Sequence, residues 1–154
     1  MKIKLAKALK LKNRMLTELN LTMNNILSYN SMPKDNEFPY ESKKLLEEYE
    51  SFVLSYVDLK ASISNANVSV NLRIFQLSEY KNMYKKLVAM NTFTGTQVQR
   101  YGSDSIVYKC QMSIIEKDKY LKDLTKKIDN IQDELDYHNQ TIEIELGDHF
   151  DQWL

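Results

Sequence analysis

Large apolar side chains recur along residues 45–63 at alternating steps of four and three residues. This spacing is typical of the buried stripe of a long helix. A similar pattern from Leu5 to Ile26 predicts a first helix of about 25 residues. Between the two patterns, the segment PKDNEFP contains Pro33 and Pro39 and favours a turn. We therefore expect two long antiparallel helices, and the stripe of the second comprises Leu45, Tyr49, Phe52, Tyr56, Leu59 and Ile63.

A further long helix is predicted in the C-terminal part of the chain. Ser113 and Glu116 have the spacing of a capping box, in which two side chains satisfy the first free backbone N–H groups of a helix. Apolar residues then follow one helical face: Ile114, Leu121, Leu124, Ile128, Ile131 and Leu135. A shorter helix is expected from about Ser78 to Met90.

Three segments show apolar residues at every second position, which is the pattern of a strand. They are residues 68–75, 106–112 and 142–146. Because two or three short strands are not stable alone, they must either pack on the helices or pair across a subunit boundary. The expected fold class is mainly α (α+β). We expect a long antiparallel helical hairpin plus further helices and a small two- or three-stranded β element, assembled as a homo-oligomer.

The length of 154 residues is enough for one domain with a single core. We expect that helical domain over residues 1–146, followed by a C-terminal tail over residues 147–154. The 21 basic and 21 acidic residues balance, so we expect neither duplex nucleic acid nor a membrane as a partner. The lone Cys110, the absence of a secretion signal and the absence of a long apolar run predict a cytoplasmic protein without a transmembrane segment.

Aromatic residues extend beyond the narrow seam that one partner helix could cover. Tyr49 and Tyr56 do so in the second helix, and Tyr80 and Tyr84 in the shorter helix. Long two-helix hairpins expose much apolar surface alone, so we expect a closed symmetric homo-oligomer. The alternative is that the strands and the other helices cover this surface within one chain.

The sequence lacks the patterns of known catalytic and metal sites. His138 and His149 do not have a metal-ligand spacing, and His138 falls on the apolar seam after Leu135. Asp148, His149 and Asp151 gather in the tail, where a frayed terminus would not hold a preorganised site. With three glycines in total, the chain offers no backbone cradle for a phosphate. We therefore expect a protein that is not an enzyme and that uses no metal and no cofactor.

Residues 91–104, with the sequence NTFTGTQVQRYGSD, are expected to form a polar loop of about fourteen residues, and loops of this length are often functional. An arginine beside an aromatic ring suits an anion attached to a planar base. The candidate ligand-binding residues are therefore Arg100, Tyr101 and Phe93, with Asn65, Asn67, Arg73 and Lys109 completing a pocket built partly by a neighbouring subunit. The alternative is a turn with incidental polar residues.

Several motifs occur in a recognisable order along residues 3–146. They are KLAKALKLKNRM, LLEEYESFV, LSEYKNMYKKL, RYGSDSIVYKCQMSI and KDKYLKDLTKKIDNIQDEL, the last of which runs into TIEIEL. In this order they resemble the septicolysin-like family of small bacterial and phage-encoded helical proteins. The resemblance implies a homo-oligomer with helical hairpins around small β elements.

Three functional hypotheses follow. The first is a sponge: a non-enzymatic homo-oligomer that sequesters an anionic, nucleotide-derived small molecule in pockets between subunits, by analogy with phage anti-defence proteins. The second is a structural or protein-interaction helical module without a small-molecule ligand. The third is an enzyme with an unfamiliar site assembled across subunits. The small size of the chain and the pairing of Arg100 with Tyr101 favour the first.

Overall fold

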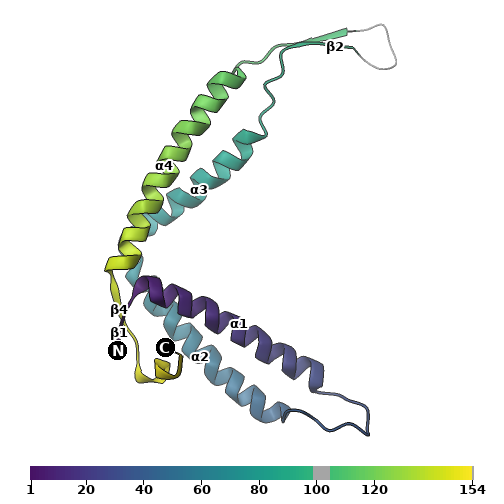
Figure 1. Ribbon diagram of the computed structural model, residues 1–154, viewed down its shortest axis with the longest axis vertical. Helices are drawn as coiled ribbons and strands as arrows, with labels where there is room; N and C mark the ends of the chain where they lie inside the picture. Colours follow the sequence, from purple (N-terminus) through teal and green to yellow (C-terminus); the bar gives the residue numbers. More distant parts are fainter. Residues whose placement is uncertain (99–104, 154) are drawn as a thin grey trace. The chain divides into compact units, whose positions relative to one another are not determined.

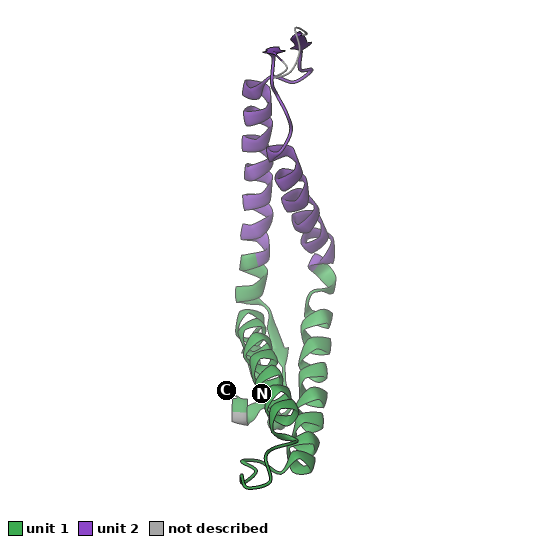
Figure 2. Ribbon diagram, turned by 90° about the vertical axis from the view of Figure 1, so that its right-hand side faces the viewer, with its two compact units in different colours: residues 1–69, 136–154 green, residues 70–135 purple. Residues whose placement is uncertain are grey.

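The computed structural model describes residues 1–98 and 105–153. The chain divides into two compact units (Figure 2). Unit 1 comprises Met1–Ser69 and Asp136–Leu154, and unit 2 comprises Val70–Leu135. The predicted domain of residues 1–146 is therefore distributed over both units, while the predicted tail belongs to unit 1.

Unit 1 is built on two long helices, α1 (Leu5–Tyr29) and α2 (Ser42–Ala66), which lie side by side and antiparallel (Figure 1). Both helices and the turn between them were predicted from the sequence, and the structure confirms them. The core of the pair contains Leu5, Leu11 and Met15 from α1 and Leu59 and Ile63 from α2. Each fully buried side chain of this size contributes about 1.5–3 kcal/mol of stability.

A small antiparallel sheet closes one end of this core. Its strands are β1 (Lys2–Lys4) and β4 (Glu143–Glu145), in a register that places Ile3 opposite Ile144. Both isoleucines are buried, whereas the charged residues on either side of them are exposed. The alternation at residues 142–146 thus predicted β4 correctly. Strand β1 was not predicted, because it has only three residues and a single apolar one among them.

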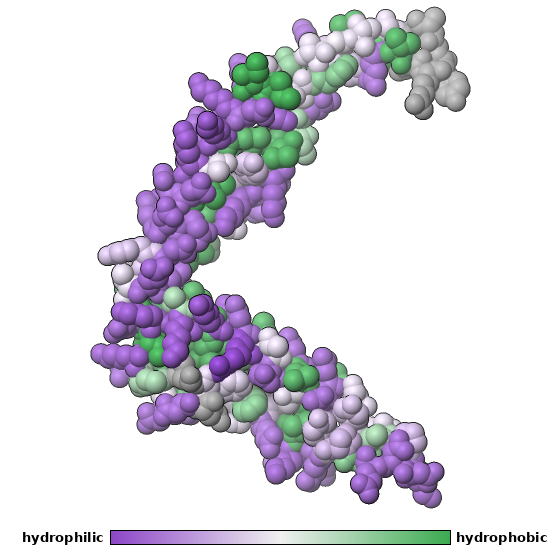
Figure 3. Space-filling view, in the orientation of Figure 1, coloured by the Kyte–Doolittle hydropathy of each residue, from purple (hydrophilic) through white to green (hydrophobic). Residues whose placement is uncertain are grey.

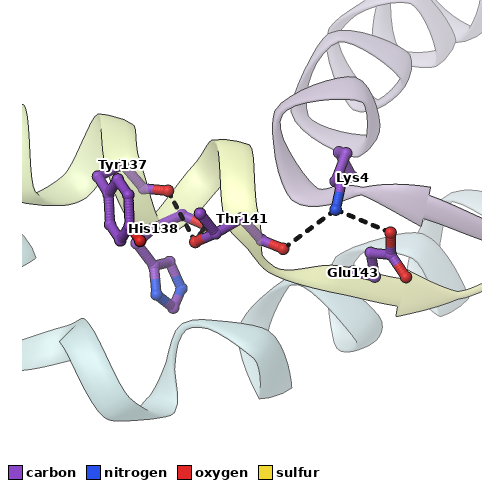
Figure 4. A network of polar contacts seen from close by, with 5 residues as sticks. All are labelled: Lys4, Tyr137, His138, Thr141 and Glu143. Atoms are coloured by element: carbon purple, nitrogen blue, oxygen red, sulfur yellow. Dashed lines mark hydrogen bonds and ion pairs between the residues drawn. The ribbon is translucent and has the colours of Figure 1, made fainter.

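Opposite charges face each other across this sheet, because Lys2 pairs with Glu145 and Lys4 with Glu143. The Nζ of Lys4 lies 2.8 Å from Oε1 of Glu143 and also donates to the carbonyl oxygen of Thr141 at 3.3 Å (Figure 4). The hydrogen bond and the charge of Lys4 lower the pKa of the Glu143 carboxyl. These cross-strand pairs stabilise the register.

The segment after β4 is packed, contrary to the expectation of a frayed tail. A 3-10 helix, η2 (Asp148–Trp153), follows the sheet, and Phe150 within it is only 1% exposed. The ring of Trp153 packs edge-on against Phe52 of α2, with 5.3 Å between ring centroids. The reason is tertiary: pairing of β4 with β1 brings the chain back to the core, where an aromatic side chain finds an apolar site.

Unit 2 contains the helix α3 (Asn71–Val88) and most of α4 (Ile114–Thr141), whose last residues, from Asp136, belong to unit 1. The strand predicted over residues 68–75 is therefore wrong. Its first residues form a 3-10 turn, η1 (Val68–Val70), and the others begin α3. Val70 and Ile74 are four residues apart, and side chains at this spacing share a face in a strand and also in a helix. Here they belong to a helical stripe that continues to Leu77.

The capping box at the start of α4 is confirmed. The backbone N–H of Ser113 donates to Oε2 of Glu116 at 2.8 Å, and the backbone N–H of Glu116 donates to Oγ of Ser113 at 3.3 Å. The Ser113 backbone N–H and, next, the Ser113 hydroxyl, which donates to the same Oε2 at 2.8 Å, lower the pKa of the Glu116 carboxyl. Further along, the predicted apolar seam buries Leu124, Ile131 and Leu135.

A second antiparallel sheet belongs to unit 2. Strand β2 (Gly95–Val98) pairs with β3 (Ser105–Tyr108), with Thr96 opposite Val107. The strand predicted over residues 106–112 exists only in its first part, since β3 ends before Cys110. The whole arrangement, helices with two small two-stranded sheets, confirms the mainly α (α+β) class.

Candidate functional site

The candidate ligand residues are divided between the two units. Asn65 and Asn67 belong to unit 1, whereas Phe93, Arg73 and Lys109 belong to unit 2. The central pair, Arg100 and Tyr101, lies outside the described residues. Asn67 is the C-cap of α2, and its backbone N–H donates to the carbonyl oxygen of Ile63 at 3.1 Å. That role is structural, and the end of a helix is sufficient to explain it.

Phe93 lies at the base of the β2–β3 hairpin. Its backbone N–H donates to Oδ1 of Asn91 at 2.9 Å, and its ring meets Tyr108 edge-on, 5.6 Å between centroids. Phe93 is 47% exposed, so part of its side chain contacts solvent. Gly95 follows with φ of +134°, a conformation that side chains rarely adopt. Lys109, just after β3, is exposed.

Arg73, on the first turn of α3, already has partners. Its Nε lies 2.9 Å from Oε2 of Glu134 on α4, and its Nη1 donates to Oε1 of Gln76 at 3.1 Å. Both members of the ion pair are about half exposed, so water screens the attraction. An anionic ligand at Arg73 would therefore have to compete with Glu134.

A polar cavity of about 240 Å³ opens beside Arg73 within unit 2, lined also by Gln76, Tyr80, Lys127, Asn130, Ile131 and Glu134. Apart from Arg73, sequence reasoning missed this set. One signal was present: Arg73, Gln76 and Tyr80 follow steps of three and four on α3, and α4 shows the same steps at Lys127, Asn130 and Glu134. Steps of three and four residues place the side chains of each set on one face of its helix.

A second cavity in unit 2 is apolar. It also measures about 240 Å³ and is lined by Met83, Leu87, Met112, Lys117, Tyr120 and Leu121. The Nζ of Lys117 donates to the carbonyl oxygens of Val88 at 3.4 Å and Met90 at 3.2 Å. The lysine thereby satisfies carbonyl groups that the end of α3 leaves free.

The histidines have local roles. Nε2 of His138 lies 3.2 Å from the carbonyl oxygen of Ala66, as expected of a histidine that is satisfied within the fold. Nε2 of His149 lies 3.9 Å from Oδ2 of Asp58, and its ring packs on Phe150. Over residues 1–98 and 105–153, no group of three or more histidine, cysteine, aspartate and glutamate side chains could hold a metal ion. Over the same residues, no helix has the length and apolarity needed to cross a membrane.

Comparisons with known proteins reveal a similar fold. No family model and no curated protein matches the chain. A similar solved structure is that of a functionally unknown conserved protein from Corynebacterium diphtheriae, with a TM-score of 0.72 and 17% sequence identity over 94% of this chain and 100% of that chain. At this identity the likeness shows a shared fold. Membership of the septicolysin-like family remains a prediction.

Proposed function

We propose that the protein is a non-enzymatic binding protein that works as a homo-oligomer. The observation that carries the proposal is the exposed apolar surface of unit 2. Large side chains from α3, the β2–β3 hairpin and α4 are each at least 65% exposed: Leu72, Phe75, Val98, Val107 and Ile115. Hydrophobic residues, coloured green, are visible at the surface of this unit, at the hairpin and beside the helices (Figure 3).

Contact of these side chains with water is unfavourable, and a second copy of the chain would remove it. A fully buried leucine, valine, isoleucine or phenylalanine contributes about 1.5–3 kcal/mol relative to an exposed one. A few such residues from each copy would therefore balance much of the entropic cost of association. A closed symmetric assembly is the form that most soluble oligomers take.

Several polar contacts of the described residues have structural roles. Lys4–Glu143, Arg73–Glu134 and Lys126–Asp123 are ion pairs between exposed side chains. The Glu116 carboxylate caps a helix. A general base or acid needs a group held in a cleft with a pKa near the working pH, and exposed pairs and caps do not supply one.

Light scattering coupled to size exclusion tests the proposal. We expect a mass that is a multiple of the 18.2 kDa chain and that persists over about a hundredfold dilution, because association follows mass action. A mass of one chain at all concentrations would contradict the proposal.

A second proposal concerns the ligand. The polar cavity of unit 2 is lined by two cations, Lys127 and Arg73, the second of which is paired with the Glu134 carboxylate in the same lining, and by the ring of Tyr80 and the amide of Asn130. This chemistry fits an anionic group joined to a planar ring, and it favours sequestration of a nucleotide-derived molecule, the sponge hypothesis. At about 240 Å³, the cavity is smaller than the roughly 300–1,000 Å³ of typical ligand sites. A neighbouring subunit would therefore have to supply further walls, for which Phe93, Arg100, Tyr101 and Lys109 are candidates.

Native mass spectrometry of protein purified from cells, followed by calorimetry with nucleotides, cyclic nucleotides and ADP-ribose derivatives, tests this second proposal. We expect Lys127→Ala and Arg100→Ala to weaken binding by about tenfold or more, because a hydrogen bond to a charged group contributes roughly 1.5–3 kcal/mol. Lys126→Ala is the matched control, since Lys126 neighbours Lys127 in the chain and does not line the cavity. Absence of binding to the wild type, or equal binding to all variants, would leave the interaction-module hypothesis in its place.

A further inference from the structure

The two small sheets of the protein differ in how they are covered. In β1–β4 the central isoleucines are buried in the core of unit 1. In β2–β3 every residue is exposed except the half-buried Gly95, and the exposed residues include Val98, Ile106 and Val107. An isolated two-stranded sheet is marginally stable in water. Such a sheet must therefore either pack on helices or pair across a subunit boundary. The exposed residues of β2–β3 do not pack on helices.

The outer edges of the hairpin are also open. Among the described residues, β2 pairs only with β3, so one edge of each strand has no strand partner. Soluble proteins usually protect such edges with charged residues, proline or bulges. Neither Gly95–Val98 nor Ser105–Tyr108 contains a charged residue or a proline. The β1–β4 sheet differs in this respect, because lysines and glutamates flank its isoleucines.

The charge pattern favours a second copy of this chain as the occupant. In an antiparallel strand pair related by a two-fold axis, the residue on the axis lies opposite its own counterpart, so a charged residue at that position would meet a like charge. The uncharged β3 avoids that repulsion. Strand β3 is better suited than β2 to pair with a second copy, because it contains three large apolar residues in succession, Ile106, Val107 and Tyr108. Strand β2 contains one, Val98.

We propose that two copies associate through β3, which pairs antiparallel with β3 of the second copy and forms a continuous four-stranded sheet. With the two-fold axis at Val107, the two Val107 side chains lie opposite each other, and Ile106 of each copy lies opposite Tyr108 of the other. Lys109 then lies opposite Ser105, which separates the two lysines. The inference rests on the proposed homo-oligomeric function and names its surface.

Cysteine cross-linking tests the register directly. In a Cys110→Ser background, Val107→Cys places two thiols opposite each other, where side chains of an antiparallel pair come within about 4.5–5.5 Å at Cβ. We expect a disulfide-linked dimer on mild oxidation. Val98→Cys reports on the β2 edge, and Ile115→Cys reports on an exposed apolar residue outside the hairpin. Cross-linking at either of these positions and not at residue 107 would overturn the proposal.

Charge substitution gives a second readout. Val107→Lys sets two ammonium groups opposite each other, and we expect the dissociation constant to rise at least about tenfold. Val107→Glu should act similarly, and mixing the two variants should restore association, because opposite charges then meet. Circular dichroism that matches the wild type shows that the helices are folded. A wild type of one-chain mass contradicts both proposals, whereas a wild-type oligomer that Val107→Lys leaves intact contradicts only the hairpin interface.

Discussion

Unit 1 and unit 2 contain the same parts, a pair of helices and a two-stranded antiparallel sheet, but they bury their side chains differently. Of the buried hydrophobic residues in the described part of the chain, unit 2 holds Leu124, Ile131 and Leu135, all on α4, and unit 1 holds the rest. Unit 1 also covers its sheet and an aromatic residue from its C-terminal segment. Unit 1 therefore completes a larger buried core than unit 2, while both units expose large apolar side chains, such as Leu27 and Leu54 in unit 1 and Leu72 and Val107 in unit 2.

Polar contacts show the same difference. In unit 2, contacts between α3 and α4 include Arg73 with Glu134 and the Nζ of Lys81 donating to Oε1 of Gln132 at 3.1 Å, both exposed. Exposed pairs of this kind contribute about 0–1 kcal/mol each, less than one buried leucine. The helices of unit 1 are held by burial, and those of unit 2 depend more on weak surface contacts.

The largest effect is expected from truncating the most buried aromatic residue of unit 1. Phe150→Ala should lower the free energy of unfolding by about 3–5 kcal/mol, because it removes apolar contacts and leaves a cavity. Phe75→Ala in unit 2 is the matched substitution, and at low protein concentration it should change that free energy by about 0.5 kcal/mol or less, since its ring is exposed. Urea titrations measure both. Equal losses would remove the distinction between the two units.

A smaller effect is expected at the start of α4. Ser113→Ala removes the hydroxyl that accepts from the Glu116 N–H, and loss of an N-cap side chain costs about 0.5–2 kcal/mol. Amide hydrogen exchange should accelerate in the first turns of α4 while the amides of α1 exchange as before. Ser78→Ala, at an exposed site inside α3, should leave exchange in α4 unchanged. An effect of Ser113→Ala that spread into unit 1 would show that the two units unfold together.

Ion pairs should contribute little in either unit. A double-mutant cycle on Arg73 and Glu134 is expected to give a coupling of about 0.2–1 kcal/mol, and the cycle on Lys4 and Glu143 a similar value, because all four side chains are about half exposed. Chemical denaturation of the single and double alanine variants measures the couplings. A coupling well above this range at Arg73 would mean that the ion pair is shielded from solvent, as an interface over the polar cavity would make it.

Acidification should have the smallest effect. The pKa values of Glu116 and Glu143 are lowered from 4.5 in the folded protein. Their stabilising contribution is therefore fully present above pH 4.5 and is lost as pH falls through the lowered values. Amide exchange at the start of α4 should accelerate in that window for the wild type and not for Glu116→Gln. Glu50→Gln, on an exposed part of α2, is the control, and the same response in both variants would contradict the assignment.

Part of the candidate site was accessible to sequence reasoning. Arg73 was selected as an unusual cation, and it lines the polar cavity of unit 2, whereas Phe93, selected as an aromatic residue in a polar segment, lies in unit 2 but does not line that cavity. The pairing of Arg73 with Glu134 was not accessible, because those residues lie sixty-one positions apart and the register of one helix against another has no local signature. Lys127 was missed for a related reason: in a chain rich in lysine, only its place beside Tyr80 and Asn130 distinguishes it.

Local patterns were sufficient for α1, α2 and α4, because periodic apolar side chains and a capping box act within a few residues of one another. They were insufficient at residues 68–75, where the strand and helix periods share a step of four and the neighbouring turns of α3 decided the outcome. Tertiary structure alone decided that β1 pairs with β4 and that Phe150 is buried, since both contacts join the two ends of the chain. No local sequence pattern specifies a contact between segments so distant in the chain.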